Sequence, residues 1–230
     1  WLTLFNRRFM SIAEDMGEML AASARSVNIR ERLDFSCALF DAQGNLIANA
    51  PHIPVHLGSM GDAVRGLIER FGPELRPGDA WLSNSPYAGG THLPDITVIM
   101  PGFDASGRRL LYFTAARAHH ADIGGIAPGS MPAASRHIAE EGCLSEGLLL
   151  MRAGLFQASA ARAWLATPPW PARNPDQNIA DLHAQVAACA LGQRLLRELA
   201  REVGEAAVTA YMGYVQDYAE TVVRRRLTRL

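Results

Sequence analysis

The chain has 230 residues, 49% of them hydrophobic, and a formal net charge of −1 at pH 7. This length is sufficient for a full hydrophobic core, in one large domain or two small ones. Because acidic and basic residues are interspersed, the chain has no basic face for nucleic acid or an anionic membrane, and we expect neither as a partner.

The three cysteines, Cys37, Cys143 and Cys189, lie far apart and form no CxxC pair. Their spacing predicts neither a disulfide framework nor a thiolate zinc site, and it favours a reducing, cytoplasmic location. No apolar run approaches the roughly 18 residues that span a bilayer. The chain begins at Trp1 rather than at a methionine, which we interpret as a trimmed start or a fragment of a longer protein.

The first half of the chain predicts a helix followed by a β-hairpin. Apolar residues recur at helical spacing over 4–24, and the apolar run 35–40 has the length of a strand. A turn at 41–44 with Gly44 at its end predicts a hairpin, in which 46–48 is the second strand. The prolines and glycine of 50–59 predict a loop that carries His52 and His56, after which Ser59 caps a helix that ends at Gly72.

A second hairpin is predicted from 96–100 and 110–116, with its turn near Ala105 and Ser106. Antiparallel pairing about that turn places His92 opposite His119 and Asp95 near Ala116. The Pro- and Trp-rich stretch 159–178 indicates an ordered linker, and helical spacing returns over 179–203 and 208–222, which predicts two long antiparallel helices.

These elements predict an α+β fold with an N-terminal helix, β-hairpins that form a mixed or antiparallel sheet, and a C-terminal helical hairpin. We expect a metal-binding core at 1–158, a linker at 159–178 and the helical hairpin at 179–230.

Two polar clusters stand beside the strands of the second hairpin. The pairing brings His92, Asp95 and His119 together, and two imidazoles with a carboxylate suit a divalent cation that keeps open positions for water or substrate. His120 should point to the opposite face of the sheet. Asp122 is either a further ligand or a cap for the glycine turn that follows it.

The remaining histidines have weaker claims. His56 is a candidate for proton transfer or anion contact, with a structural hydrogen bond as the alternative. For His52, His137 and His183 we favour structural roles.

Four stretches of the sequence closely resemble the hydantoinase B/oxoprolinase family. They are Asn-Ser-Pro-Tyr-Ala-Gly-Gly-Thr-His-Leu-Pro-Asp (84–95), Ala-His-His-Ala-Asp-Ile-Gly-Gly (118–125), Pro-Val-His-Leu-Gly-Ser-Met (54–60) and Arg-Leu-Asp-Phe-Ser-Cys-Ala-Leu-Phe-Asp (32–41). The segment Asp-Leu-His-Ala-Gln (181–185) extends the resemblance to the helical tail.

The resemblance implies a subunit of an ATP-dependent cyclic-amide hydrolase that opens hydantoin or 5-oxoproline. The substrate would be phosphorylated by a hydantoinase A-type partner, which agrees with the absence of GxxxxGK[ST] in this sequence. The family also includes ATP-dependent ketone carboxylases, so that a carboxylase subunit is the alternative, together with a non-catalytic assembly module.

By motif, the resemblance implies His92, Asp95 and His119 as metal ligands, with manganese as the expected ion and zinc or iron as alternatives. In this scheme Asp122 supports the site and His56 transfers protons. Members of the family are longer, and we expect the chain to correspond to the N-terminal half of a hetero-oligomeric subunit.

Overall fold

The computed structural model describes residues 1–50 and 53–229, and it confirms an α+β fold. The described residues form one 7-stranded antiparallel sheet in the order β2-β1-β5-β4-β3-β6-β7. The strands are β1 (Phe35–Asp41), β2 (Leu46–Asn49), β3 (Ala80–Ser83), β4 (Asp95–Phe103), β5 (Leu110–His119), β6 (Leu148–Arg152) and β7 (Leu155–Phe156). The helices are α1 (Leu2–Ser23), α2 (Val27–Arg30), α3 (Pro54–Phe71), α4 (Ala158–Ala166), α5 (Pro175–Val203) and α6 (Glu205–Leu227), with short 3₁₀ turns at Gly72–Glu74, Pro86–Ala88 and Ile138–Glu140.

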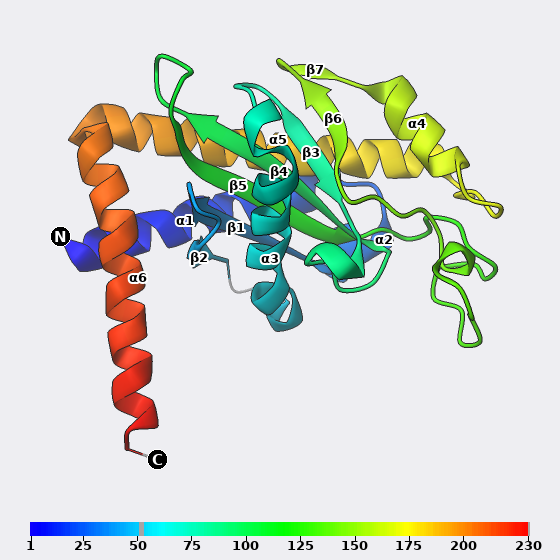
Figure 1. The fold of residues 1–230 in the computed structure, drawn as a ribbon, viewed down its shortest axis with the longest axis horizontal. Helices are drawn as coiled ribbons and strands as arrows, with labels where there is room; N and C mark the ends of the chain where they lie inside the picture. Colours follow the sequence, from blue (N-terminus) through cyan, green and yellow to red (C-terminus); the bar gives the residue numbers. More distant parts are fainter. Residues whose placement is uncertain (51–52, 230) are drawn as a thin grey trace.

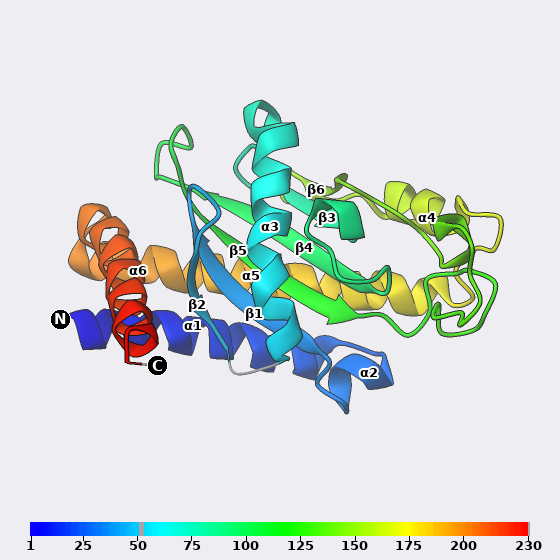
Figure 2. The same ribbon diagram turned by 60° about the horizontal axis from the view of Figure 1, so that its bottom comes forward.

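The sheet is the middle of three layers (Figures 1 and 2). Helices α1 and α5 lie side by side against one face, and α3 crosses the other. Side chains of β1 alternate between the two layers: Phe35, Cys37 and Leu39 belong to the core under α1 and α5, whereas Ala38 and Phe40 pack under α3. No described helix is long and apolar enough to cross a membrane.

The first hairpin is confirmed. Strands β1 and β2 pair antiparallel, and Gly44 adopts a φ of +80° at the turn, where glycine avoids the steric cost of a side chain. Helix α1 also matches its prediction to within two residues at its N-terminal end.

The second hairpin forms, but its predicted register is wrong by three residues. Asp95 pairs with His119, and not with Ala116. The turn closed by the Gly107 N–H and the Asp104 carbonyl lies where predicted, but the loop continues to Arg109, whose carbonyl accepts a hydrogen bond from the Asp104 N–H, and an irregularity between Gly102 and Phe103 shifts the pairing further. The correction brings the clusters closer, since Asp95 and His119 are now directly opposite.

Helix α3 begins at Pro54, so that the prediction of a loop through Ser59 is wrong. Proline fits the first turn of a helix because its missing N–H has no acceptor to serve there. This places His56 in the first turn of α3 with its side chain buried. His52 lies outside the described residues.

Helix α5 is attached to the sheet by hydrogen bonds as well as by apolar contacts. The Gln185 side-chain amide donates to the carbonyls of Ile96 and Ala116, both at 2.8 Å, and so bridges β4 and β5. Two turns further along α5, the Gln193 amide donates to two carbonyls at the other end of β4, at 3.1 and 2.9 Å. The helix therefore has a fixed position along the two strands that carry the polar clusters.

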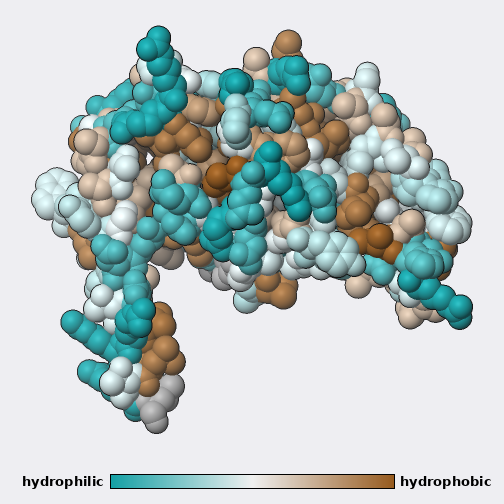
Figure 3. Space-filling view, in the orientation of Figure 1, coloured by the Kyte–Doolittle hydropathy of each residue, from teal (hydrophilic) through white to brown (hydrophobic). Residues whose placement is uncertain are grey.

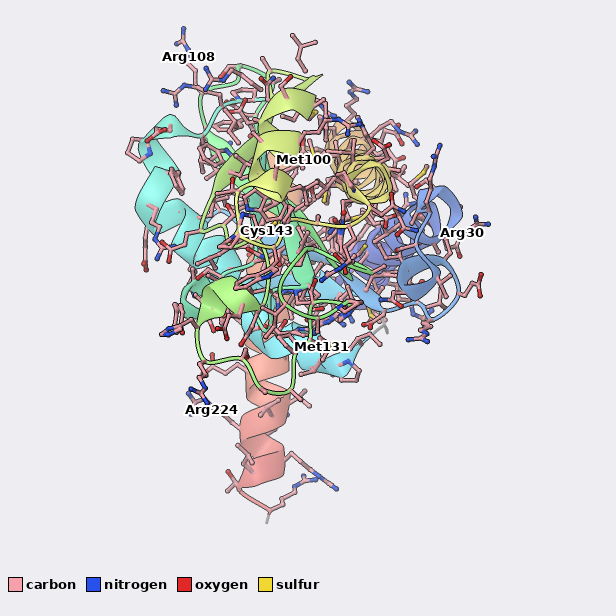
Figure 4. The ribbon with its side chains drawn as sticks, turned by 90° about the vertical axis from the view of Figure 1, so that its right-hand side faces the viewer. Arg30, Met100, Arg108, Met131, Cys143 and Arg224 are labelled. Atoms are coloured by element: carbon pink, nitrogen blue, oxygen red, sulfur yellow. The ribbon has the colours of Figure 1, made fainter. Side chains whose placement is uncertain are left out.

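The C-terminal region has the predicted helices in a different arrangement. Helix α4 occupies much of the predicted linker, and α5 begins at Pro175. After Gly204, α6 turns away from α5 and projects from the body, so that the two helices do not pack along their lengths (Figure 1). Figure 4 shows Arg224 on this projecting helix, far from Arg108 in the β4–β5 loop. Figure 3 shows hydrophobic residues along one side of the end of α6, where Val222 and Leu227 are exposed.

Candidate metal centre

The polar clusters meet where β4 begins and β5 ends, on the face of the sheet that α3 covers. Successive residues of a strand face opposite sides, so that Arg117 and His119 share this face with Asp95. His120 points to the other face, as predicted, where its Nε2 lies 3.0 Å from Gln185 Oε1 on α5. Of the two adjacent histidines, only His119 reaches the cluster.

Asp95 is the centre of this cluster and is 1% exposed. Its Oδ2 lies 3.0 Å from His92 Nδ1 and 3.3 Å from His56 Nε2, and its Oδ1 lies 3.2 Å from His119 Nδ1. The Thr91 hydroxyl donates a further hydrogen bond to Oδ2. One buried carboxylate thus accepts from three imidazoles and a hydroxyl.

The donor set of His92, Asp95 and His119 fits a divalent cation. One ligand atom from each residue lies within 4.8 Å of the other two. Ligand atoms at 2.0–2.2 Å from one ion are about 3–4 Å apart, so that only a small contraction of these side chains is needed. His56 and Thr91 also contact the Asp95 carboxylate and orient it. Ligands that are oriented by further hydrogen bonds are typical of protein metal sites.

The electrostatics of the cluster favour an ionised Asp95. Burial opposes the charge, but hydrogen bonds from His119, His56, His92 and Thr91 outweigh it and hold the pKa of Asp95 well below its usual range. The hydrogen bond to Asp95 raises the pKa of His92. A carboxylate that keeps its charge is the form that binds a metal.

His56 has a partner on each ring nitrogen. Its side chain is 2% exposed, and both ring nitrogens are occupied: Nδ1 lies 3.0 Å from Ser36 Oγ, and Nε2 contacts Asp95. This geometry favours the alternative that the sequence left open, a structural hydrogen bond, in which His56 orients Asp95.

Asp122 has the contacts of a turn cap. Its carboxylate accepts from the backbone N–H groups of Gly124 and Gly129, both at 3.0 Å, and pairs with the Arg173 guanidinium at 2.8 Å. It is not a member of the three-residue group that could hold an ion in the described part of the chain. The other histidines also have local contacts, since His137 caps a 3₁₀ turn and His183 stacks on Phe156.

The loop that carries Thr91 and His92 sits directly on α3. Gly89 adopts a φ of +81°, and a Cβ there would lie 2.1 Å from the backbone N of Ala63 in α3. Only glycine allows this close approach, which brings the loop over the end of the sheet. Arg117, which is buried and donates to the Gly89 carbonyl, was not predicted, because an arginine inside an apolar strand carries no motif.

A cavity of about 620 Å³ lies at the opposite end of β4 and β5, and its lining includes Phe103, Tyr112 and Arg197. None of its lining residues belongs to the His/Asp cluster. The candidate metal centre is thus separate from this cavity.

The chain is similar to known proteins in both sequence and fold. The family model described as Hydantoinase B/oxoprolinase matches residues 1–230. The chain is 48% identical to 5-oxoprolinase 1 of Arabidopsis thaliana over 235 residues, which cover 98% of this chain and 18% of that protein. The crystal structure of ATP-dependent caprolactamase from Pseudomonas jessenii matches with a TM-score of 0.88 and 28% identity, over 98% of this chain and 38% of that one.

The nucleotide-free structure of acetone carboxylase has the same fold, with a TM-score of 0.82 at 22% identity, over 91% of this chain and 28% of that one. The chain spans only a small part of the length of each of these three proteins. Because the family model matches its whole length, the chain belongs to the hydantoinase B/oxoprolinase family.

Proposed function

We propose that the chain is the hydantoinase B-type part of an ATP-dependent enzyme that opens cyclic amides. The names of two similar proteins support this substrate class, because 5-oxoproline and caprolactam are both lactams. The likeness to acetone carboxylase is one of fold alone at 22% identity, and so it gives less support to the carboxylase alternative.

The observation that carries the proposal is the convergence of His92, Asp95 and His119. Exposure increases outward from the buried carboxylate, since the side chain of His119 is 13% exposed and that of His92 is 37% exposed. The open side lies at His92, where a small substrate would approach. A divalent ion, which we propose to be manganese, would when bound polarise a carbonyl oxygen and lower the pKa of bound water.

The residues of the chain then have distinct roles. His92, Asp95 and His119 hold the ion. His56 and Thr91 keep the Asp95 carboxylate oriented toward it. We do not assign proton transfer to His56, whose ring nitrogens are both engaged.

Asp122 fixes the loop that contains Gly124 and Gly129 through its hydrogen bonds. The proposal gives His56 and Asp122 supporting roles, and their catalytic roles stay predictions.

The proposed reaction requires a phosphorylating partner. Transfer of the γ-phosphoryl group of ATP to the ring amide oxygen, by a hydantoinase A-type partner, would give a phosphorylated imidate. Water then adds to the ring carbon, and the C–N bond breaks as the nitrogen takes a proton. This leaves an acyl phosphate, and a second water releases inorganic phosphate and the open-chain amino acid.

Co-expression with a hydantoinase A-type partner tests the proposal. ATP consumption is measured with 5-oxoproline, with hydantoins, and with ketones plus bicarbonate. We expect a lactam or hydantoin to raise ATP turnover in wild type and not in His92→Ala. Stimulation by ketone and bicarbonate alone would establish the carboxylase alternative. Metal-replete complex that responds to none of these substrates would support a non-catalytic assembly role.

A further inference from the structure

Arg117 is a fully buried arginine beside the candidate metal centre, with 0% of its surface exposed. It lies on β5 two residues before His119, opposite Thr97 on β4. Its three hydrogen bonds go to neutral oxygens and not to a carboxylate. Burial lowers its pKa to about 10 while the negative charge of Asp95 opposes this shift, so that the guanidinium remains protonated at neutral pH. A buried cation with neutral hydrogen-bond partners is costly to place, and the Asp95 carboxylate offsets part of that cost, which links Arg117 to the candidate metal centre.

The guanidinium connects three parts of the protein that build the site. Its Nε donates to Thr97 Oγ1 at 2.8 Å, which fixes the group over β4, and one terminal nitrogen donates to Ser59 Oγ on α3. The other terminal nitrogen donates to the Gly89 carbonyl at 2.7 Å. Strand, helix and loop are thus held by one side chain.

The bond to Gly89 fixes one end of the segment that carries His92. His92 follows Gly89 by three residues. The other end of the segment is anchored by the Asn84 side-chain amide, which donates to the Leu93 carbonyl at 2.7 Å, and by the His120 N–H, which donates to the Pro94 carbonyl at 2.9 Å. His92 is also the most exposed of the three proposed ligands. Of the three, it therefore depends most on its loop for its position.

We propose that Arg117 is a positioning residue for the metal centre. It clamps the 89–92 loop against β5 and α3, so that His92 Nδ1 stays within reach of Asp95 and His119, and in this way it sets the affinity of the site for a divalent ion. The inference rests on the metal site of the proposed function. Lysine cannot replace arginine in this role, because a single ammonium cannot span three diverging acceptors in the plane of a guanidinium fork.

Arg117→Lys tests this role, with Gln193→Ala as the matched control. Gln193 is also buried and also bonds to β4 carbonyls, but at the end of the strand away from the metal centre. Both variants should unfold at lower urea concentration than wild type, so that stability alone does not separate them. Mn²⁺ titration and hydrogen exchange of the metal-free full chain do.

For Arg117→Lys we expect the Kd for Mn²⁺ to rise about 10–100-fold, as for other residues that orient metal ligands. We also expect faster exchange in peptides that cover 86–95 of the metal-free protein. Gln193→Ala should keep the wild-type Kd and the wild-type exchange in these peptides. Ser59→Ala, which removes one brace of the guanidinium and leaves the bond to Gly89, should fall between wild type and Arg117→Lys.

The outcomes separate the two claims. If wild type binds Mn²⁺ and Arg117→Lys binds it equally well with unchanged exchange over 86–95, the positioning role is wrong and the metal site stands. If wild type binds no divalent ion at all, the metal site fails and the effect of Arg117 on affinity fails with it. An equal loss of affinity in Gln193→Ala would also overturn the inference, because the effect would then follow stability and not position.

Discussion

Replacing Asp95 by asparagine removes the acceptor on which the whole cluster depends. The carboxylate accepts from Thr91, His56, His92 and His119, and it is buried. The asparagine side chain in the Asp95→Asn variant would have a similar shape but would turn an amide N–H₂ toward groups that donate, and it would carry no charge to balance a protonated imidazole.

The expected loss of stability is large. Removing one partner of a buried, hydrogen-bonded charged group costs about 3–5 kcal/mol. At about 2–4 °C per kcal/mol for a chain of this size, Tm should fall by roughly 6–20 °C. The free energy of unfolding is measured by urea titration in EDTA, so that metal binding makes no contribution.

Asp34→Asn is the matched control for this prediction. In the wild type the Asp34 carboxylate lies 3.9 Å from His119 Nδ1, and the Asp34 side chain is 34% exposed. A pair of this kind contributes only about 0–1 kcal/mol. If Asp95→Asn in EDTA were no less stable than Asp34→Asn, the view of Asp95 as the centre of the network would be refuted.

Three further predictions concern the surroundings of the site. Burial opposes a charge on Asp122, but hydrogen bonds from loop N–H groups and the Arg173 guanidinium lower its pKa. The stabilisation that this carboxylate gives is therefore present above the unfolded pKa of about 3.9 and is lost as the pH falls through the lower folded value. Asp122→Asn should reduce the pH dependence of the free energy of unfolding below about pH 4, and an unchanged slope would contradict this. Burial raises the pKa of Cys143 and of Cys189 to about 12, so that iodoacetamide at pH 8 should modify them in urea and not in the native protein; native labelling at the unfolded rate would count against their burial. Gly89→Ala should lower the free energy of unfolding by at least about 1 kcal/mol, and by more than Gly154→Ala does, because both glycines have positive φ but a Cβ at Gly89 would also clash with α3. Urea titration compares the two variants, and equal losses of stability would contradict the close contact between Gly89 and α3.

Local signals in the sequence predicted those parts of the fold that depend on neighbouring residues. Helix α1 follows from its apolar spacing, and the first hairpin follows from Gly44. The second hairpin was predicted with the wrong register because a loop of six residues, from Asp104 to Arg109, can centre at several positions, and side-chain bonds to Asp104 decide between them. The start of α3 was missed because proline usually indicates a loop. Proline breaks a helix in its interior but is favourable at its first position, which is where Pro54 lies.

In the candidate site too, some residues could be predicted from local sequence and others could not. Alternation along a strand was sufficient to separate His119 from His120, and hairpin pairing together with the family resemblance selected His92 and Asp95. The roles of His56 and Arg117 depend on contacts between residues distant in sequence, such as that between Arg117 and Gly89, and no local pattern encodes such contacts. These contacts hold the proposed metal ligands in place and are not part of the proposed ligand set, so that sequence motifs alone did not predict them.

The central claim is that His92, Asp95 and His119 together bind one divalent ion. Mn²⁺ titration of the metal-stripped chain, followed by elemental analysis of the purified complex, tests it directly. We expect one ion per chain in wild type and in His137→Ala, whose histidine caps a distant turn, and no stoichiometric ion in His92→Ala or His119→Ala. Wild type that binds no Mn²⁺, Zn²⁺ or Fe²⁺, or that binds an ion equally well without His92 and His119, would contradict the account.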